Sequence, residues 1–251
     1  MVLPKLNTSP KYEMVIPSSK QTVRYRPYLV KEEKVLLMAF ESNDSSQAMN
    51  AIIDTILVCV DENIKRETLT TFDVEYMFTQ IRSKSVGETS KVNVKCEKCE
   101  TLNAVTINLA EVELDTPESV NNEIQLTPEV SIELSYPSAD SLISIDKEAT
   151  QAEKILATIV ASIDVIKTEE ERVSTKDVTK KEVEEFVDGM TGEQFSNLAE
   201  YVKNIPTLKE NVENTDERTG DIKFIDKKLI SVFSGKWNTC VYVANKLERL
   251  L

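Results

Sequence analysis

The sequence feature that most constrains the fold is a Cys-x-x-Cys motif, Cys96 to Cys99, between two segments of alternating apolar and polar residues. Apolar residues stand at every second position on both sides of it, at Val92, Val94, Val105, Ile107 and Leu109. A period of two is typical of strands with one apolar face. The segment 91–109 therefore predicts a β-hairpin with two thiols at its tip, which resembles one half of a zinc ribbon.

Metal binding at this tip needs more ligands than the chain offers nearby. A closed zinc site takes four ligands, whereas the chain has no histidine and only two further cysteines, Cys59 and Cys240. Each of these lies in an apolar stretch, so we interpret both as small core residues. Three interpretations of Cys96 and Cys99 stay open: zinc ligands completed by other groups or other chains, a redox pair, or a surface hairpin without metal. A redox pair is disfavoured because the residues after Cys99 alternate like a strand, not like the helix start that lowers a thiol pKa.

Composition excludes several classes of function. The absence of histidine rules out Ser-His-Asp and Cys-His catalytic groups, and the five glycines form no phosphate-binding loop. The net charge of −13 disfavours nucleic acid as a partner, because phosphate binding needs clustered Lys and Arg. No apolar run approaches the ~20 residues that span a bilayer. We therefore expect a non-enzymatic protein of a reducing cytoplasm without a membrane segment.

The first half of the chain predicts an arm followed by helices. Four of the eight prolines fall within residues 1–30, which suggests an extended arm that ends in a hairpin of 12–16 and 22–26. Helical spacing of apolar residues then predicts three helices, over 31–40, over 48–60, and from Thr70 to a stop at Gly87. We assign 31–115, including the cysteine hairpin, to one helical unit.

The second half predicts a mixed part over 120–251. Two alternating segments, 124–126 and 130–136, predict a strand pair, and an amphipathic helix is expected over 148–167. Capping boxes predict two more helices, at Thr179 with Glu182 and at Thr191 with Gln194.

The end of the chain predicts a second, degenerate hairpin near 208–225, with a polar loop over 208–220 and a strand over 221–225. Val212 and Thr215 stand there where the first hairpin has its cysteines, and a helix with an apolar face from Trp237 to Leu251 follows. The fold class is therefore α+β, with helical bundle elements and small β-hairpins, one of them a zinc-ribbon-like knuckle.

Basic residues cluster at the end of the arm. Arg24 and Arg26 lie close in sequence to Lys31 and Lys34, in an otherwise acidic chain. We expect this cluster to dock an acidic partner or a second copy of the chain, although a solvated face is the simpler alternative. The candidate partner-binding residues are Arg24, Tyr25, Arg26 and Tyr28, of which the two tyrosines also fit core positions.

Several longer strings carry a resemblance to a known family. They are the segments 2–7, 12–18, 25–34, 72–76, 81–88 and 94–99. Together they resemble the baseplate hub family of contractile-tailed, T-even-type bacteriophages. The resemblance covers most of the first hundred residues and only the general layout beyond residue 120. Relatives can carry a second Cys-x-x-Cys near the C-terminus, from which this chain departs at Val212 and Thr215.

The resemblance implies a structural protein of the tail baseplate hub, made in the host cytoplasm and built into the virion. Its partners would be other hub proteins, in an oligomer of three copies or a multiple. We expect residues 1–30 to contact another subunit by adding a strand to a neighbouring sheet. Two alternatives remain: a hub assembly catalyst that is absent from the finished virion, and a thiol redox protein that uses Cys96 and Cys99.

Overall fold

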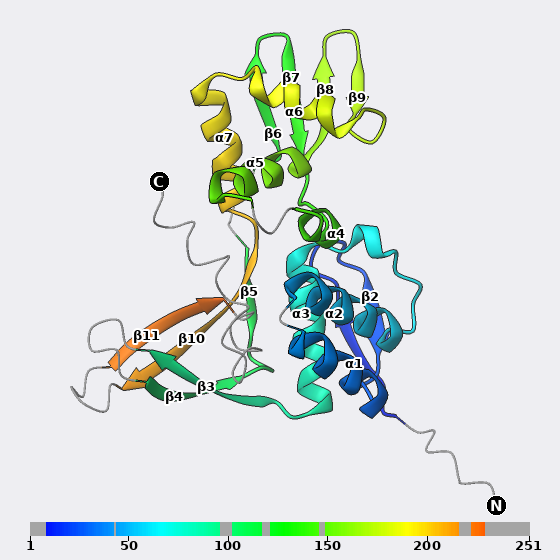
Figure 1. Cartoon of the computed structure of the whole chain (residues 1–251), viewed down its shortest axis with the longest axis vertical. Coiled ribbons are helices and arrows are strands. Elements are labelled where there is room, and N and C mark those ends of the chain that lie inside the picture. The colour runs from blue at the N-terminus through cyan, green and yellow to red at the C-terminus, as the bar shows by residue number, and fades with distance from the viewer. Residues whose placement is uncertain are drawn as a thin grey trace, which may run out of the picture. The chain divides into compact units, whose positions relative to one another are not determined.

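The computed structural model of the chain describes residues 9–42, 44–95, 102–116, 121–145, 149–215 and 222–228. These residues form α-helices and small antiparallel sheets, which confirms the α+β class (Figure 1). No zinc-ribbon knuckle is shown, because Cys96 and Cys99 lie outside the described residues, as does Cys240. None of the described helices is long and apolar enough to cross a membrane.

The described residues group into two compact units. The first draws on the described residues within 1–66, 72–115 and 207–251, and the second on those within 67–71 and 116–206. The expectation from the sequence that 120–251 forms one C-terminal part stays a prediction. The strand that follows Pro206 pairs with a strand of the first unit.

The first unit begins with an antiparallel hairpin followed by three helices, as predicted. The bounds are β1 Tyr12–Val15, β2 Thr22–Tyr25, α1 Val30–Glu41, α2 Ser45–Cys59 and α3 Thr71–Ser85, with a short 3-10 helix at Arg66–Thr68. The Asp44 side chain caps α2 by accepting hydrogen bonds from the Ser46 and Gln47 N–H groups. Gly87 follows α3 with a φ of 137°, a conformation that glycine adopts most easily.

The core of this unit lies between the hairpin, α2 and α3. Val23 and Tyr25 of β2 are buried, and Tyr25 is only 2% exposed. The helices contribute Ile53, Ile56, Cys59, Phe72, Met77, Phe78 and Ile81. Burial of Cys59 confirms that it is a core residue, and the same burial raises the pKa of its thiol to about 11.

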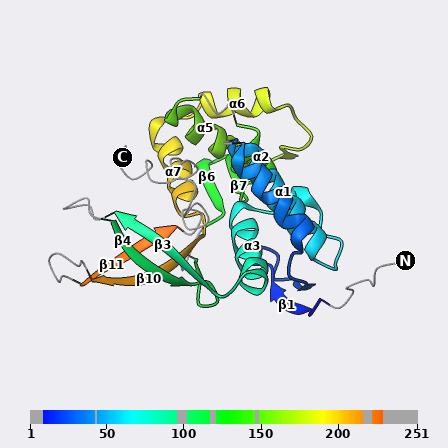
Figure 2. The ribbon, with the colours of Figure 1, turned by 60° about the horizontal axis from the view of Figure 1, so that its bottom comes forward.

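Two further hairpins complete the first unit, and Figure 2 shows them side by side. The cysteine-flanking strands β3 (Thr89–Lys95) and β4 (Leu102–Asn108) pair antiparallel, with Lys95 opposite Leu102. The three-stranded sheet β11-β10-β5 is made of β5 (Glu113–Asp115), β10 (Thr207–Thr215) and β11 (Ile222–Lys228).

The polar loop predicted over 208–220 is wrong over its first half, where β10 lies. Pairing with β5 and β11 satisfies the main-chain groups of this strand, so it forms although its residues do not alternate in polarity. Val212 is paired with Ile225 inside the hairpin, and Thr215 is the last residue of β10, opposite Ile222. Val212 is therefore not at the tip, where the overlay with the cysteine motif had put it.

The second unit consists of a four-stranded antiparallel sheet, in the order β6-β7-β8-β9, and of helices packed on it (Figure 1). The bounds are β6 Glu123–Thr127, β7 Val130–Leu134, α4 Ala139–Ile143, α5 Gln151–Ser162, β8 Ile163–Thr168, β9 Arg172–Ser174, α6 Lys180–Asp188 and α7 Gly192–Lys203. The core contains Ile132, Leu134, Ile159, Ile163, Val183, Val187, Leu198 and Tyr201.

Both capping boxes predicted for this unit are confirmed, and one helix end is not. Thr179 and Thr191 cap α6 and α7 through Glu182 and Gln194. The helix predicted over 148–167 is wrong at its end, because the chain turns into β8 after Ser162. The residues beyond are mostly β-branched and pair with β7, and this pairing outweighs their helical spacing.

Candidate interaction surface

The first unit carries the predicted partner-binding residues, and its hairpin is tied to α3. Asp73, fully buried in the first turn of α3, accepts two hydrogen bonds from Ser18 in the turn between β1 and β2. The Ser18 N–H lies 2.9 Å from Oδ1, and its hydroxyl lies 2.6 Å from Oδ2. Because both bonds are charge-assisted, they fix the hairpin against the helices.

The outer edge of β2 is occupied by the segment after α2. The Asp61 N–H donates to the Arg24 carbonyl and the Arg26 N–H donates to the Cys59 carbonyl, both at 2.9 Å. The Arg24 N–H donates to the Glu62 carboxylate at 2.8 Å. Strand β2 is therefore paired on both sides.

Strand β1 pairs only with β2 among the described strands. The Ile16 N–H donates to the Gln21 carbonyl, so by alternation Met14 also bonds across the hairpin. Glu13 and Val15 then direct their N–H and C=O groups away from β2. Both side chains are exposed as well, which leaves β1 with an accessible edge.

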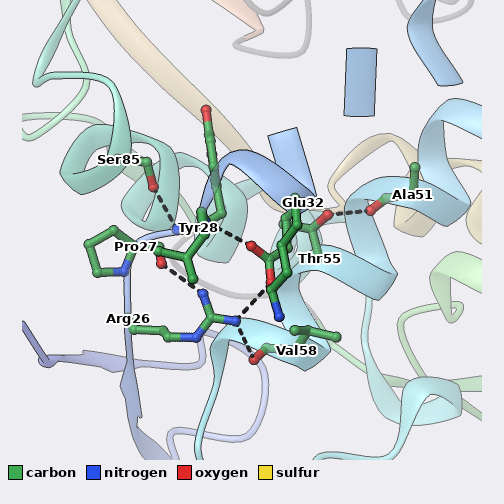
Figure 3. A network of polar contacts seen from close by, with 10 residues as sticks. Arg26, Pro27, Tyr28, Glu32, Ala51, Thr55, Val58 and Ser85 are labelled. Atoms are coloured by element: carbon green, nitrogen blue, oxygen red, sulfur yellow. Dashed lines mark hydrogen bonds and ion pairs between the residues drawn. The ribbon is translucent and has the colours of Figure 1, made fainter. Parts of the chain in front are cut away.

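Arg26 and Glu32 form the network of Figure 3, which joins the end of β2 to the start of α1 and to the end of α2. The Arg26 guanidinium donates to Glu32 Oε1 at 2.9 Å, to the Pro27 carbonyl at 3.0 Å and to the Val58 carbonyl at 3.4 Å. The other oxygen of Glu32 accepts from the Leu29 N–H at 2.8 Å, which satisfies a main-chain donor at the start of α1.

Glu32 is buried, and its ionisation depends on these donors. Burial raises the pKa of Glu32, but the hydrogen bonds from Arg26, Leu29 and Lys31 lower it more, so that the pKa lies below its usual value of 4.5. The carboxylate is thus charged at neutral pH. Arg26 therefore serves the internal structure of this unit with its guanidinium, and it is only partly exposed.

The other predicted residues differ in their access to solvent. Tyr25 is buried and Tyr28 is half-buried, with its N–H donating to the Ser85 hydroxyl at 2.9 Å. Arg24 is exposed and lies 3.7 Å from Glu62. Lys31 is exposed and lies 3.3 Å from Glu32. The structure thus exposes Arg24 and Lys31, but it exposes neither Arg26 nor the tyrosines fully.

An apolar surface next to this cluster is the feature that sequence reasoning missed. Five of the eight exposed large apolar side chains in the described residues fall between Leu29 and Met38. They are Leu29, Val30, Val35, Leu37 and Met38, and Met38 is the most exposed at 72%. Within α1, by contrast, Leu36 is buried. Helix α1 therefore has an apolar side that the described residues of its own unit do not cover.

A signal for this surface is present in the sequence. Residues 35–40 are six consecutive apolar residues, Val-Leu-Leu-Met-Ala-Phe. Since an α-helix turns once in 3.6 residues, such a run covers its whole circumference. A helix packed on one side cannot bury all of it.

No metal centre is found in this surface or elsewhere in the described residues, which contain no group of three or more Cys, Asp or Glu placed to hold an ion. Cys96 and Cys99 lie outside the described residues, and we derive no chemistry through a metal.

Comparison with known proteins finds one protein family that the chain matches. The profile of a family described as T4 bacteriophage base plate protein matches residues 9–234, which is well over half of the chain. No curated protein matches the chain, and no solved structure does.

Proposed function

The chain belongs to the T4 bacteriophage base plate protein family, and from this premise we propose that it is a non-enzymatic structural component of the baseplate hub. A member of this family is a phage base plate component that interacts with other base plate proteins in the virion tail. The role in the hub, and assembly through protein contacts alone, are the finer parts of the proposal.

The accessible edge of β1 is the observation that carries the proposal. Strand addition needs a strand with outward main-chain groups, held firmly enough that it does not rearrange on binding. Glu13 and Val15 supply such groups. Ser18 and Asp73 hold the hairpin in place. This arrangement supports a contact between residues 1–30 and a strand of a neighbouring hub protein.

Deletion of residues 2–11 is the first test of this contact. We expect hub assembly in a reconstituted or complemented phage to be lost, while the purified variant keeps its circular dichroism spectrum and melting temperature. Hub assembly at the normal level would overturn the proposed role of the arm.

Val15→Pro is a sharper test, because it removes only one outward N–H group and leaves the bonds between β1 and β2 in place. Val15→Thr is the matched control, since threonine keeps the N–H group and a β-branched shape. We expect the proline variant to assemble poorly and the threonine variant to assemble normally. Equal assembly by the two variants would argue against strand addition at this edge.

Mass spectrometry of purified particles distinguishes the structural role from the assembly-catalyst alternative. A structural component is present in the finished virion at a fixed ratio to the other base plate proteins. Absence from particles whose assembly nevertheless depends on the chain would replace the structural role with that of an assembly factor.

A further inference from the structure

Helix α1 carries exposed charges of both signs on its uncovered side, among them Lys34 and Glu41. Val30, Lys34, Leu37 and Glu41 follow one another at spacings of four, three and four, which places them along one stripe of the helix. Met38 lies beside this stripe, and all five residues are exposed. The described residues provide no hydrogen bond or ion pair for Lys34 or Glu41, whereas the neighbouring Lys31 pairs with Glu32.

The pattern of this stripe is complementary to itself. In an antiparallel pair of α1 helices centred between Leu37 and Met38, Leu37 of each copy lies opposite Met38 of the other. Lys34 of each copy then lies opposite Glu41 of the other, because both residues are equally far from the centre of the pair. Two apolar contacts are thus flanked by two ion pairs, in the symmetry of an isologous two-fold interface.

We propose that the exposed stripe of α1 binds the same stripe of a second copy of this chain, antiparallel and about a two-fold axis. The opposite charges of Lys34 and Glu41 favour a second copy over a partner that carries charges of one sign. A strongly acidic or basic partner helix would satisfy only one of Lys34 and Glu41 and would repel the other. A second copy satisfies both, and it removes Leu37 and Met38 from water.

The size of the stripe predicts a weak association. Twelve residues of α-helix extend about 18 Å. One side of such a helix covers less than the about 800 Å² that each partner buries in a standard interface. We therefore expect a dimer in the micromolar range or weaker, in equilibrium with monomer.

Charge reversal tests the pairing directly. In sedimentation-velocity runs over a concentration series of the full chain, we expect Lys34→Glu and Glu41→Lys each to weaken dimerisation about tenfold, because each creates two like-charge contacts. The double variant K34E/E41K restores opposite charges at both ends and should dimerise like the wild type. Glu129→Lys, in an exposed turn of the second unit, is the matched control and should leave dimerisation unchanged.

Met38→Asp tests the apolar centre of the same contact. It should abolish the dimer and lower the melting temperature of the monomer only slightly, because the side chain is exposed and the cost is that of an aspartate near the end of a helix. A wild-type chain that stays monomeric at every soluble concentration overturns the proposal. So does a trimer, or a double variant that dimerises no better than the single ones. None of these outcomes touches the proposed hub role, which is tested by assembly into particles.

Discussion

The two units treat their apolar side chains in opposite ways. In the second unit, α5, α6 and α7 bury their apolar sides against the sheet, through residues such as Ile159, Val187 and Leu198. In the first unit, α1 buries Leu36 and leaves Met38 and its apolar neighbours exposed. All eight exposed large apolar side chains of the described residues lie in the first unit. The second unit thus buries its large apolar side chains in its own core, whereas the described residues of the first leave several of theirs exposed.

The outer face of the second unit's sheet sharpens this contrast. Glu123 and Glu133 stand opposite one another on β6 and β7. Lys167 lies 3.0 Å from Glu123 and 2.5 Å from Glu133, and Arg172 lies 2.6 Å from Glu133. Each of the four strands contributes one of these charged side chains, so this part of the face is polar.

Leu198→Ala should show the largest effect on stability. Leu198 is buried in the core of the second unit, and truncation of such a leucine costs about 2–5 kcal/mol of unfolding free energy. Met38→Ala is the matched change in the first unit and should stay within about 0.5 kcal/mol. Urea unfolding followed by circular dichroism measures both. Comparable losses of unfolding free energy in the two variants would mean that Met38 is packed against other residues and not exposed.

Glu32→Gln should show the next largest effect. It removes the negative charge that accepts hydrogen bonds from the Arg26 guanidinium and from the Leu29 N–H at the start of α1. We expect a loss of about 1.5–3 kcal/mol at pH 7 by urea unfolding. The exposed neighbour Glu33→Gln is the control and should change little.

The pH dependence of the Glu32 contribution has a defined sign. The pKa of Glu32 is lower in the folded chain than its usual 4.5, so ionisation stabilises the fold. The difference between wild type and Glu32→Gln should therefore be complete above about pH 4.5 and shrink as the pH falls through the folded-state pKa. A difference that grows on acidification would contradict the role of the ion pair.

Local signals explain which parts of the fold could be predicted. The helices α6 and α7 were predicted because Thr179 and Thr191 start capping boxes, which act within four residues. The end of α5 was missed because Ile163 and Ile166 fit a helix as well as a strand, and pairing with β7 decides. Strand β10 was missed because its partner β5 lies far earlier in the chain.

The candidate surface was predicted only in part for a similar reason. Arg24, Lys31 and Lys34 were found as charges, which need no partner to be recognised. The sequence did not show that Arg26 is bound by Glu32, because a cluster of charges does not specify its pairs. Nor did helical spacing show which side of α1 is covered, since that depends on α2, which packs against it.

Thr179→Ala should have a smaller effect than the changes above. The Thr179 hydroxyl accepts a hydrogen bond from the Glu182 N–H at the start of α6. Loss of such a cap costs about 1 kcal/mol. The variant Thr179→Ser keeps the hydroxyl and should recover most of the loss in a thermal melt. If serine and alanine were equally destabilising, the cap would not be the source of the effect.

Lys167→Met should have the smallest effect on stability and a specific effect on a carboxyl group. The hydrogen bond from Lys167 is the main cause that holds the pKa of Glu133 below its usual value; desolvation opposes it, and Arg172 lowers the pKa further. Without Lys167, Glu133 faces Glu123 across the strands, so its pKa should rise in an NMR titration. The destabilisation should be seen at low salt and shrink at high salt, because these side chains are partly exposed to solvent. Lys176→Met, at the looser contact of 3.7 Å with Asp164, is the control and should leave the pKa of Glu133 unchanged. An unchanged pKa in Lys167→Met would mean that this face of the sheet is ordered by its strands alone, and the contrast between the units would then rest only on where their apolar residues lie.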